Sequence, residues 1–195
     1  MTSLLRPALS LFVLLSVLTG LAYPLAVTGV SQLLFAHTAN GSILAVNGKP
    51  VGSALIGQNF TDPRHFWGRP SATGPQPYNG AASSGSNQGP LNPALTDAVK
   101  ARMAALRAAD PGNDKPVPVD LVTASGSGLD PDISLAAARY QVARVAKARS
   151  LPAETVQALI EHHAERPWLG TFGEPRVNVL RLNLALDGRE AQPLD

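Results

Sequence analysis

Cysteine is absent from all 195 residues of the chain. Disulfide bridges and thiolate metal sites are therefore excluded, although the compartment is not fixed, because a periplasmic domain can fold without disulfides. Charge is also scarce: Lys, Arg, Asp and Glu make up 15% of the residues, and the formal net charge is +2. A chain so close to neutral builds no basic field, so we expect no nucleic-acid partner.

No charged residue occurs between Pro7 and Gly48. About 20 consecutive apolar residues cross the hydrocarbon core of a bilayer, and residues 9–35 supply that length with some to spare. We therefore expect a short cytoplasmic N-terminus at 1–8, one transmembrane helix at 9–35 and one extracytoplasmic domain at 36–195. Pro24 is tolerated in a span because neighbouring helices can satisfy the freed carbonyl group, so it predicts a kink that faces protein.

A cleaved signal peptide is the alternative to a retained anchor, because Arg6 is basic and Gly20-Leu21-Ala22 could serve as a cleavage site. Apolar character continues past this site to Phe35, which is too long for the apolar core of a typical signal peptide. Arg6 lies close to the span, whereas the next charge after the span is the more distant Lys49. This asymmetry favours an N-terminus in the cytoplasm and a domain outside the inner membrane.

The rest of the chain predicts a mixed α+β domain that begins with a β-hairpin. Asn47-Gly48 lies between two apolar runs, and both residue types accept positive φ, which makes the pair a strong hairpin signal. Pro50 cannot donate a hydrogen bond, so it should keep the returning strand at a sheet edge.

Apolar periodicity predicts the later elements. Helical spacing indicates helices at 93–110, 134–148 and 152–164, the first of them capped by Asn92. Alternation indicates strands at 117–123 and 176–186. The second strand would bury one face, which consists of Leu180, Leu182, Leu184 and Leu186.

Residues 57–93 are rich in Gly and Pro, as linkers are, but they also contain four aromatic residues. We expect an ordered, turn-rich surface loop held by these side chains, and such loops serve either as partner surfaces or as structural cover. Arg64 and Arg69 flank Phe66-Trp67, and they could either stack on the rings or be ordinary solvated arginines. The candidate partner-contact residues are Phe60, Phe66, Trp67, Arg69, Tyr78 and Asn87.

No catalytic motif is recognisable: G-x-S-x-G, S-x-x-K and a cysteine nucleophile are all missing from the sequence. His162 and His163 are adjacent and would point about 100° apart, whereas zinc ligands on one helix face lie four residues apart, so no metal site is expected. We interpret Asp130 and Asp132 as favourable charges at the start of the next helix. On residues alone, the chain is a membrane-anchored accessory or binding protein and not an enzyme.

Five runs resemble one known family when taken in order. They are GQNF…FWGRPSAT (57–73), PYNGAASSGSNQGPLNP (77–93), DLVTASGSGLDPDIS (120–134), RVAKAR (144–149) and GEPRVNVLRLNLALD (173–187). They resemble the KdpC family, the C subunit of the Kdp potassium-transporting ATPase, and the likeness includes the single N-terminal span.

This resemblance implies a non-catalytic subunit of an ATP-driven pump that imports K⁺ at high affinity. The implied partners are a channel-like potassium-binding subunit, a P-type ATP-hydrolysing subunit and a very small stabilising peptide. The family has been described as a catalytic chaperone that raises the ATP affinity of the hydrolysing subunit, with Gln141 matching a glutamine assigned to nucleotide contact.

A nucleotide role conflicts with the expected topology, because ATP is cytoplasmic and the domain would lie outside. We therefore expect the chain itself to bind no cofactor, the span to dock on the partners, and the domain to cover the outer mouth of the K⁺ pathway. From the sequence Gln141 is expected on or beside an exposed helix face. The alternative function is a free-standing, membrane-anchored extracytoplasmic binding protein.

Overall fold

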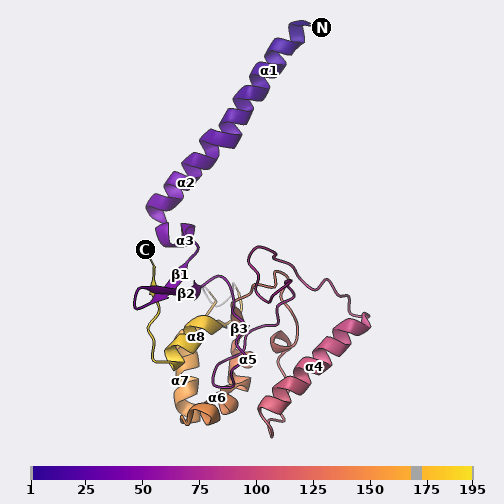
Figure 1. The fold of residues 1–195 in the computed structure, drawn as a ribbon, viewed down its shortest axis with the longest axis vertical. Coiled ribbons are helices and arrows are strands. Elements are labelled where there is room, and N and C mark those ends of the chain that lie inside the picture. The colour runs from indigo at the N-terminus through magenta and orange to yellow at the C-terminus, as the bar shows by residue number, and fades with distance from the viewer. Residues whose placement is uncertain (1, 168–172, 195) are drawn as a thin grey trace.

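The computed structural model describes residues 2–167 and 173–194. One long helix projects from a domain of two small sheets and several shorter helices (Figure 1). The predicted fold class, an N-terminal apolar helix followed by a mixed α+β domain, is confirmed.

The projecting rod consists of α1 (Thr2–Val17), a π-helical turn (Leu18–Ala22) and α2 (Tyr23–Leu34). Residues Ser3–Leu34 are long and apolar enough to cross a membrane, and their most apolar window is not buried against the domain. At 1.5 Å per residue this helix extends about 48 Å, well beyond a hydrocarbon core of about 30 Å. The helix is therefore long enough to span a bilayer and still reach the domain.

Pro24 lies two residues after Ala22, the last residue of the π-helical turn. The Tyr23 N–H donates to the carbonyl oxygen of Leu18, five residues earlier, so the helix widens immediately before the residue that has no N–H to donate. The π turn thus accommodates Pro24 within the long helix, which continues as α2.

The predicted hairpin is confirmed. After the short helix α3 (Ala36–Ala39), β1 (Ile43–Val46) pairs antiparallel with β2 (Lys49–Ser53), and Asn47 and Gly48 have φ values of 52° and 73°. The strand β6 (Gln192–Pro193) pairs on the other side of β1, so the order is β2-β1-β6 and Pro50 lies on an edge strand, as expected. The C-terminal strand therefore returns to the root of the long helix (Figure 1).

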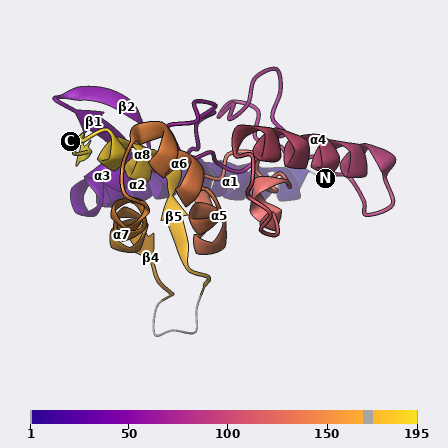
Figure 2. The same ribbon diagram turned by 90° about the horizontal axis from the view of Figure 1, so that it is seen from below.

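A second sheet lies deeper in the domain. Its order is β3-β5-β4, from β3 (Asp132–Ser134), β5 (Arg176–Asn178) and β4 (Ala164–Glu165), with both pairings antiparallel. The helices α5 (Leu135–Tyr140), α6 (Val142–Arg149) and α7 (Ala153–His163) pack beside this sheet (Figure 2). The prediction of a helix at 152–164 is confirmed.

The prediction of a strand across 176–186 is wrong beyond Asn178. Residues Val179–Leu186 form the helix α8, and the Asn178 side chain caps it by accepting a hydrogen bond from the Arg181 N–H at 3.1 Å. The helix is buried on two sides, because one set of its side chains packs in the larger core and another packs against Leu44 in a smaller core. A helix with two buried faces carries apolar residues at most positions. Its sequence therefore contains the alternating apolar residues that are typical of a β-strand. Val179, Leu182 and Leu186 pack in the larger core, and Leu180 and Leu184 pack in the smaller one.

Two other predictions differ from the structure. The segment 117–123 forms a 3-10 turn at Val119–Leu121 and no strand, because prolines at 116 and 118 remove backbone donors. The helix that follows Asp130 and Asp132 is capped by Ser134, whose side chain accepts from the Ala137 N–H. The two aspartates instead pair with arginines elsewhere in the domain.

The helix α4 (Pro93–Ala109) forms as predicted, with the Asn92 side chain accepting a hydrogen bond from the Ala94 N–H. It lies along one side of the domain (Figures 1 and 2), and only Leu106 of its apolar stripe is fully buried. The other stripe residues, Leu95, Val99 and Met103, are partly covered. Much of α4 therefore remains open to solvent beside the loop of residues 57–92.

Candidate functional site

The loop of residues 57–92 is ordered around two consecutive residues, Phe66 and Trp67. Phe66 is completely buried in the larger core, and Trp67 packs against its edge. Phe66 therefore offers a partner no accessible surface, although it was among the candidate contact residues. The aromatic residues hold the loop in place, as predicted.

An amide side chain holds the backbone of each of these two residues. The Phe66 N–H donates to Asn183 Oδ1 at 2.7 Å, and Asn183 Nδ2 donates back to the Phe66 carbonyl oxygen at 3.0 Å. In the same way, the Trp67 N–H donates to Gln141 Oε1 at 2.8 Å, and Gln141 Nε2 donates to the Trp67 carbonyl oxygen at 3.1 Å. We call these contacts, in which the side-chain amides of Gln141 and Asn183 bind the backbone of residues 66–67, the amide clamp.

Gln141 lies where the predicted helix 134–148 is broken into α5 and α6. Its side chain is 1% exposed and not on a surface, which corrects the expected location. Besides the clamp contacts, Nε2 donates to the Ala137 carbonyl oxygen, and Oε1 accepts from Arg144 Nη2 at 2.6 Å. Both amide hydrogens and both lone pairs thus have partners inside the domain.

Arg144 reinforces the clamp. Its guanidinium lies 4.3 Å from the centre of the Trp67 ring, and Nη1 donates to the carbonyl oxygens of Pro63 and His65. Burial lowers the Arg144 pKa to about 10, so the group stays charged at neutral pH. The cation on Trp67 is therefore Arg144, whereas Arg64 pairs with Asp62 and Arg69 with Asp130.

A third link joins the loop to the end of α8. His65 Nε2 lies 3.1 Å from Asp187 Oδ1, and Arg149 Nη2 reaches the same oxygen at 2.5 Å. Burial raises the pKa of Asp187, but the hydrogen bonds from Arg149 and His65 outweigh this and lower its pKa overall. Arg149 and Arg144 are therefore bound within the domain and do not form a solvated cationic face.

Four of the candidate contact residues gather in one cleft of about 430 Å³, which we call the α4 cleft. It lies between the loop and α4, and Arg102 and Ala105 contribute from the helix. Asn87 is exposed elsewhere on the loop and does not line the cleft. The four residues in the wall are Phe60, Trp67, Arg69 and Tyr78.

Tyr78 fixes the wall of the α4 cleft. Its hydroxyl donates to the Arg69 carbonyl oxygen, and its N–H donates to Ser71 Oγ. Burial raises the pKa of Tyr78 to about 12, with the charge of Asp130 acting in the same direction, so the phenol stays protonated. The ring presses on Gly57, where an added Cβ would lie 2.3 Å from the ring, so this position needs a glycine.

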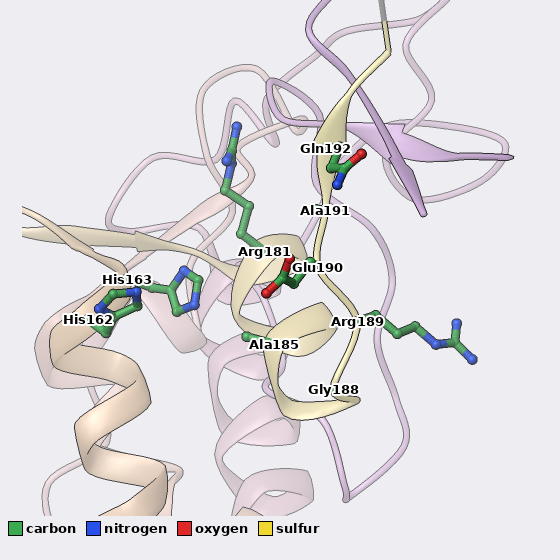
Figure 3. A pocket seen from close by; sticks show the side chains of 9 residues that line it. All are labelled: His162, His163, Arg181, Ala185, Gly188, Arg189, Glu190, Ala191 and Gln192. Atoms are coloured by element: carbon green, nitrogen blue, oxygen red, sulfur yellow. The ribbon is translucent and has the colours of Figure 1, made fainter. Parts of the chain in front are cut away.

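A second hollow, of about 470 Å³, lies between α7, α8 and the C-terminal strand (Figure 3). His162 and His163 stack edge to face at its rim, 5.2 Å apart, and Figure 3 shows Arg189 pointing away from them. Burial, the neighbouring His162 and Arg181 lower the pKa of His163, which favours its neutral form. Within residues 2–167 and 173–194, no three His, Cys, Asp or Glu side chains are grouped to hold a metal.

Comparison with known proteins places the chain in a family. The family model described as KdpC, the c chain of a K⁺-transporting ATPase, matches residues 5–188. The chain belongs to the KdpC family. A potassium-transporting ATPase KdpC subunit of Polaromonas naphthalenivorans is 70% identical over 96% of this chain and 95% of the relative. Those of Variovorax paradoxus and Dechloromonas aromatica are 68% and 64% identical over similar shares.

The sequence did not predict that Asn183, Gln141 and Arg144 hold the loop of residues 57–92 in place. The available signal was an amide within an apolar run, Leu182-Asn183-Leu184, since buried polar groups require partners. Those partners are backbone atoms more than 70 positions away in the sequence, which no local pattern reveals.

Proposed function

We propose that this chain is a non-catalytic accessory subunit of a high-affinity, ATP-driven potassium pump, and that it supports assembly and stability of the pump. The observation that carries this proposal is identity of up to 70% over nearly full length to proteins named as KdpC subunits of potassium-transporting ATPases. The proposed partners are the channel-like potassium-binding subunit, the ATP-hydrolysing P-type subunit and the small stabilising peptide. K⁺ is the cargo of the complex and not a ligand of this chain.

The helix Ser3–Leu34 serves in this proposal as the anchor in the inner membrane, with the N-terminus in the cytoplasm and the domain outside. Arg6 at the start of the helix and the absence of charge until Lys49 support this orientation. Fusing alkaline phosphatase to the C-terminus should give an active enzyme, because this reporter folds only outside the cytoplasm. A fluorescent C-terminal green fluorescent protein fusion would contradict the orientation.

In this proposal Gln141 supports the fold and does not contact ATP. Its buried amide already has four partners within the domain, so a nucleotide could reach it only after the loop had left the core. The domain would then influence the pump from the outer face, by stabilising the assembly or by covering the K⁺ entrance. A chaperone-like effect on ATP affinity would have to be transmitted through the partners.

Copurification tests the role as a subunit. A tagged chain should bring down potassium-stimulated ATPase activity from detergent-solubilised membranes, and a chain without residues 3–34 should not. The comparisons do not favour a free-standing binding protein, which would purify without that activity. Purification of the intact chain without ATPase activity, from cells that express all pump subunits, would contradict the proposal.

A further inference from the structure

The α4 cleft has an unusual charge balance. Its lining contains two arginines, Arg69 and Arg102, and no aspartate or glutamate among its thirteen described residues. In water two cations would need no counter-ion, but a partly buried guanidinium loses hydration that only an anion or several hydrogen-bond acceptors replace. The cleft is therefore electrostatically suited to a negatively charged group.

Arg102 is the less satisfied of the two cations. Its Nη1 donates to the Val122 carbonyl oxygen at 2.8 Å, and in the described part of the chain no carboxylate lies within ion-pair distance. Burial lowers the Arg102 pKa, because the charged guanidinium has lost part of its hydration. By contrast, Arg69 pairs with Asp130 at 3.1 Å, although its buried Nε lacks a partner in the described residues.

The aromatic wall opposite Arg102 has no need of polar partners. The Trp67 indole N–H donates to the Asp62 carbonyl oxygen, and the Tyr78 hydroxyl donates to the Arg69 carbonyl oxygen. Phe60 and Trp67 are only partly buried, so ring surface remains available to an occupant. The cleft thus offers one cation and apolar ring surface, which together match a short peptide segment with a carboxylate.

The α4 cleft lies on the side of the domain toward which the long helix leans. Figures 1 and 2 both show the long helix leaning over the side of the domain that carries α4. A neighbour that packs on the α4-facing side of this helix would project its extracytoplasmic loops toward the side of the domain that carries α4. This placement favours a segment of a neighbouring subunit over a free solute.

We propose that the α4 cleft receives an acidic loop of another pump subunit, with a carboxylate of that loop paired to Arg102. This inference rests on the proposed function, because it needs the chain to be part of a complex. The occupant would contact α4 and residues 67–71 at once, and so fix the loop and the helix relative to the partner.

Cross-linking in the assembled complex identifies the occupant. The chain has no cysteine of its own, so an Ala105→Cys variant can carry a single benzophenone group in the cleft. Ala104→Cys, at a position that is exposed on the same helix and outside the cleft, is the matched control. We expect the Ala105→Cys variant to cross-link to a peptide of another subunit that contains Asp or Glu, and the Ala104→Cys variant to do so several-fold less.

A charge reversal tests the ion pair. Arg102→Glu should reduce several-fold the amount of partner subunit that copurifies with the tagged chain at moderate salt. Arg102→Lys should keep most of this copurification. Lys100→Glu, on the same helix, should behave as the wild type does. Thermal unfolding of each purified chain shows whether the variant is folded. The cross-linking test uses a chain that keeps Arg102, so its result stands even if the Arg102 variants are unstable.

Three results would overturn the inference. One is cross-linking of the Ala105→Cys variant to lipid only or to no subunit, and another is equal copurification of partner subunit with the Arg102→Glu and Lys100→Glu variants. The third is a thermal shift of the wild-type chain by succinate that Arg102→Gln abolishes, which would assign the cleft to free carboxylates. If the wild-type chain itself brings down no ATPase activity, the proposed function has failed and not this inference alone.

Discussion

Replacing Gln141 with alanine separates a structural role from a nucleotide role. The substitution leaves two buried donors, the Trp67 N–H and Arg144 Nη2, without their acceptor. Each orphaned donor costs about 1–3 kcal/mol, so we expect the free energy of unfolding to fall by about 3 kcal/mol. For a chain of this size about 2–4 °C is lost per kcal/mol, so the midpoint of thermal unfolding should fall by about 6–12 °C.

The assay compares the wild-type chain, Gln141→Ala and Gln157→Ala, a control whose glutamine is exposed on α7. Thermal unfolding of the full-length chain in detergent gives the stability. Potassium-stimulated ATP hydrolysis by the assembled pump gives the apparent ATP affinity. We expect the Gln141 variant to be unstable and poorly incorporated, yet the pumps that do assemble should show the wild-type ATP affinity.

The opposite pattern would refute this reasoning. An unchanged unfolding midpoint with a several-fold weaker ATP affinity would mean that the Gln141 side chain leaves the clamp and meets the nucleotide. If Gln141→Ala lowers both the stability and the ATP affinity, Asn183→Ala distinguishes the two explanations. This variant breaks the other half of the amide clamp at a residue that has no nucleotide role assigned to it. If both variants weaken ATP affinity equally, the effect is structural.

Three further outcomes are expected. Asn183→Ala should lower the free energy of unfolding by about 1–3 kcal/mol, because it orphans the buried Phe66 N–H, and urea unfolding measures this. Phe66→Ala should cost about 3–5 kcal/mol through the cavity it leaves, whereas a loss below about 1 kcal/mol would show that the loop does not depend on this ring. Folding lowers the Asp187 pKa, so the carboxylate stabilises the domain above a pH of about 4 and this contribution is lost as pH falls toward the lowered value. Asp187→Asn should therefore lose less stability than the wild type on acidification below a pH of about 4, and parallel losses would contradict the link.

The sequence predicted those elements whose signals are local. Asn47-Gly48 set the hairpin through positive φ, Asn92 and Pro93 set the start of α4, and the uncharged run set the long helix. Each of these signals acts within a few residues. None depends on what lies across the core.

Predictions failed where tertiary packing decided the outcome. The segment 179–186 is buried on two sides as a helix, so its leucines repeat too densely for the pattern to distinguish helix from strand. Gln141 breaks the helix predicted at 134–148 and turns inward to bind the backbone of Trp67, a contact between segments far apart in sequence. No cleft was predicted, although four residues of the α4 cleft were among the candidate contact residues, because the contribution of Arg102 depends on how α4 packs beside the loop.

Side-selective labelling of one introduced cysteine tests the central claim most directly, namely that the domain is held outside the membrane, away from cytoplasmic ATP. Ser84 is exposed on the loop, and Ser3 lies at the far end of the long helix. In intact cells whose outer membrane has been made permeable, a maleimide that cannot cross the inner membrane should label Ser84→Cys and not Ser3→Cys. Labelling of Ser3→Cys alone would place the domain in the cytoplasm and contradict the account.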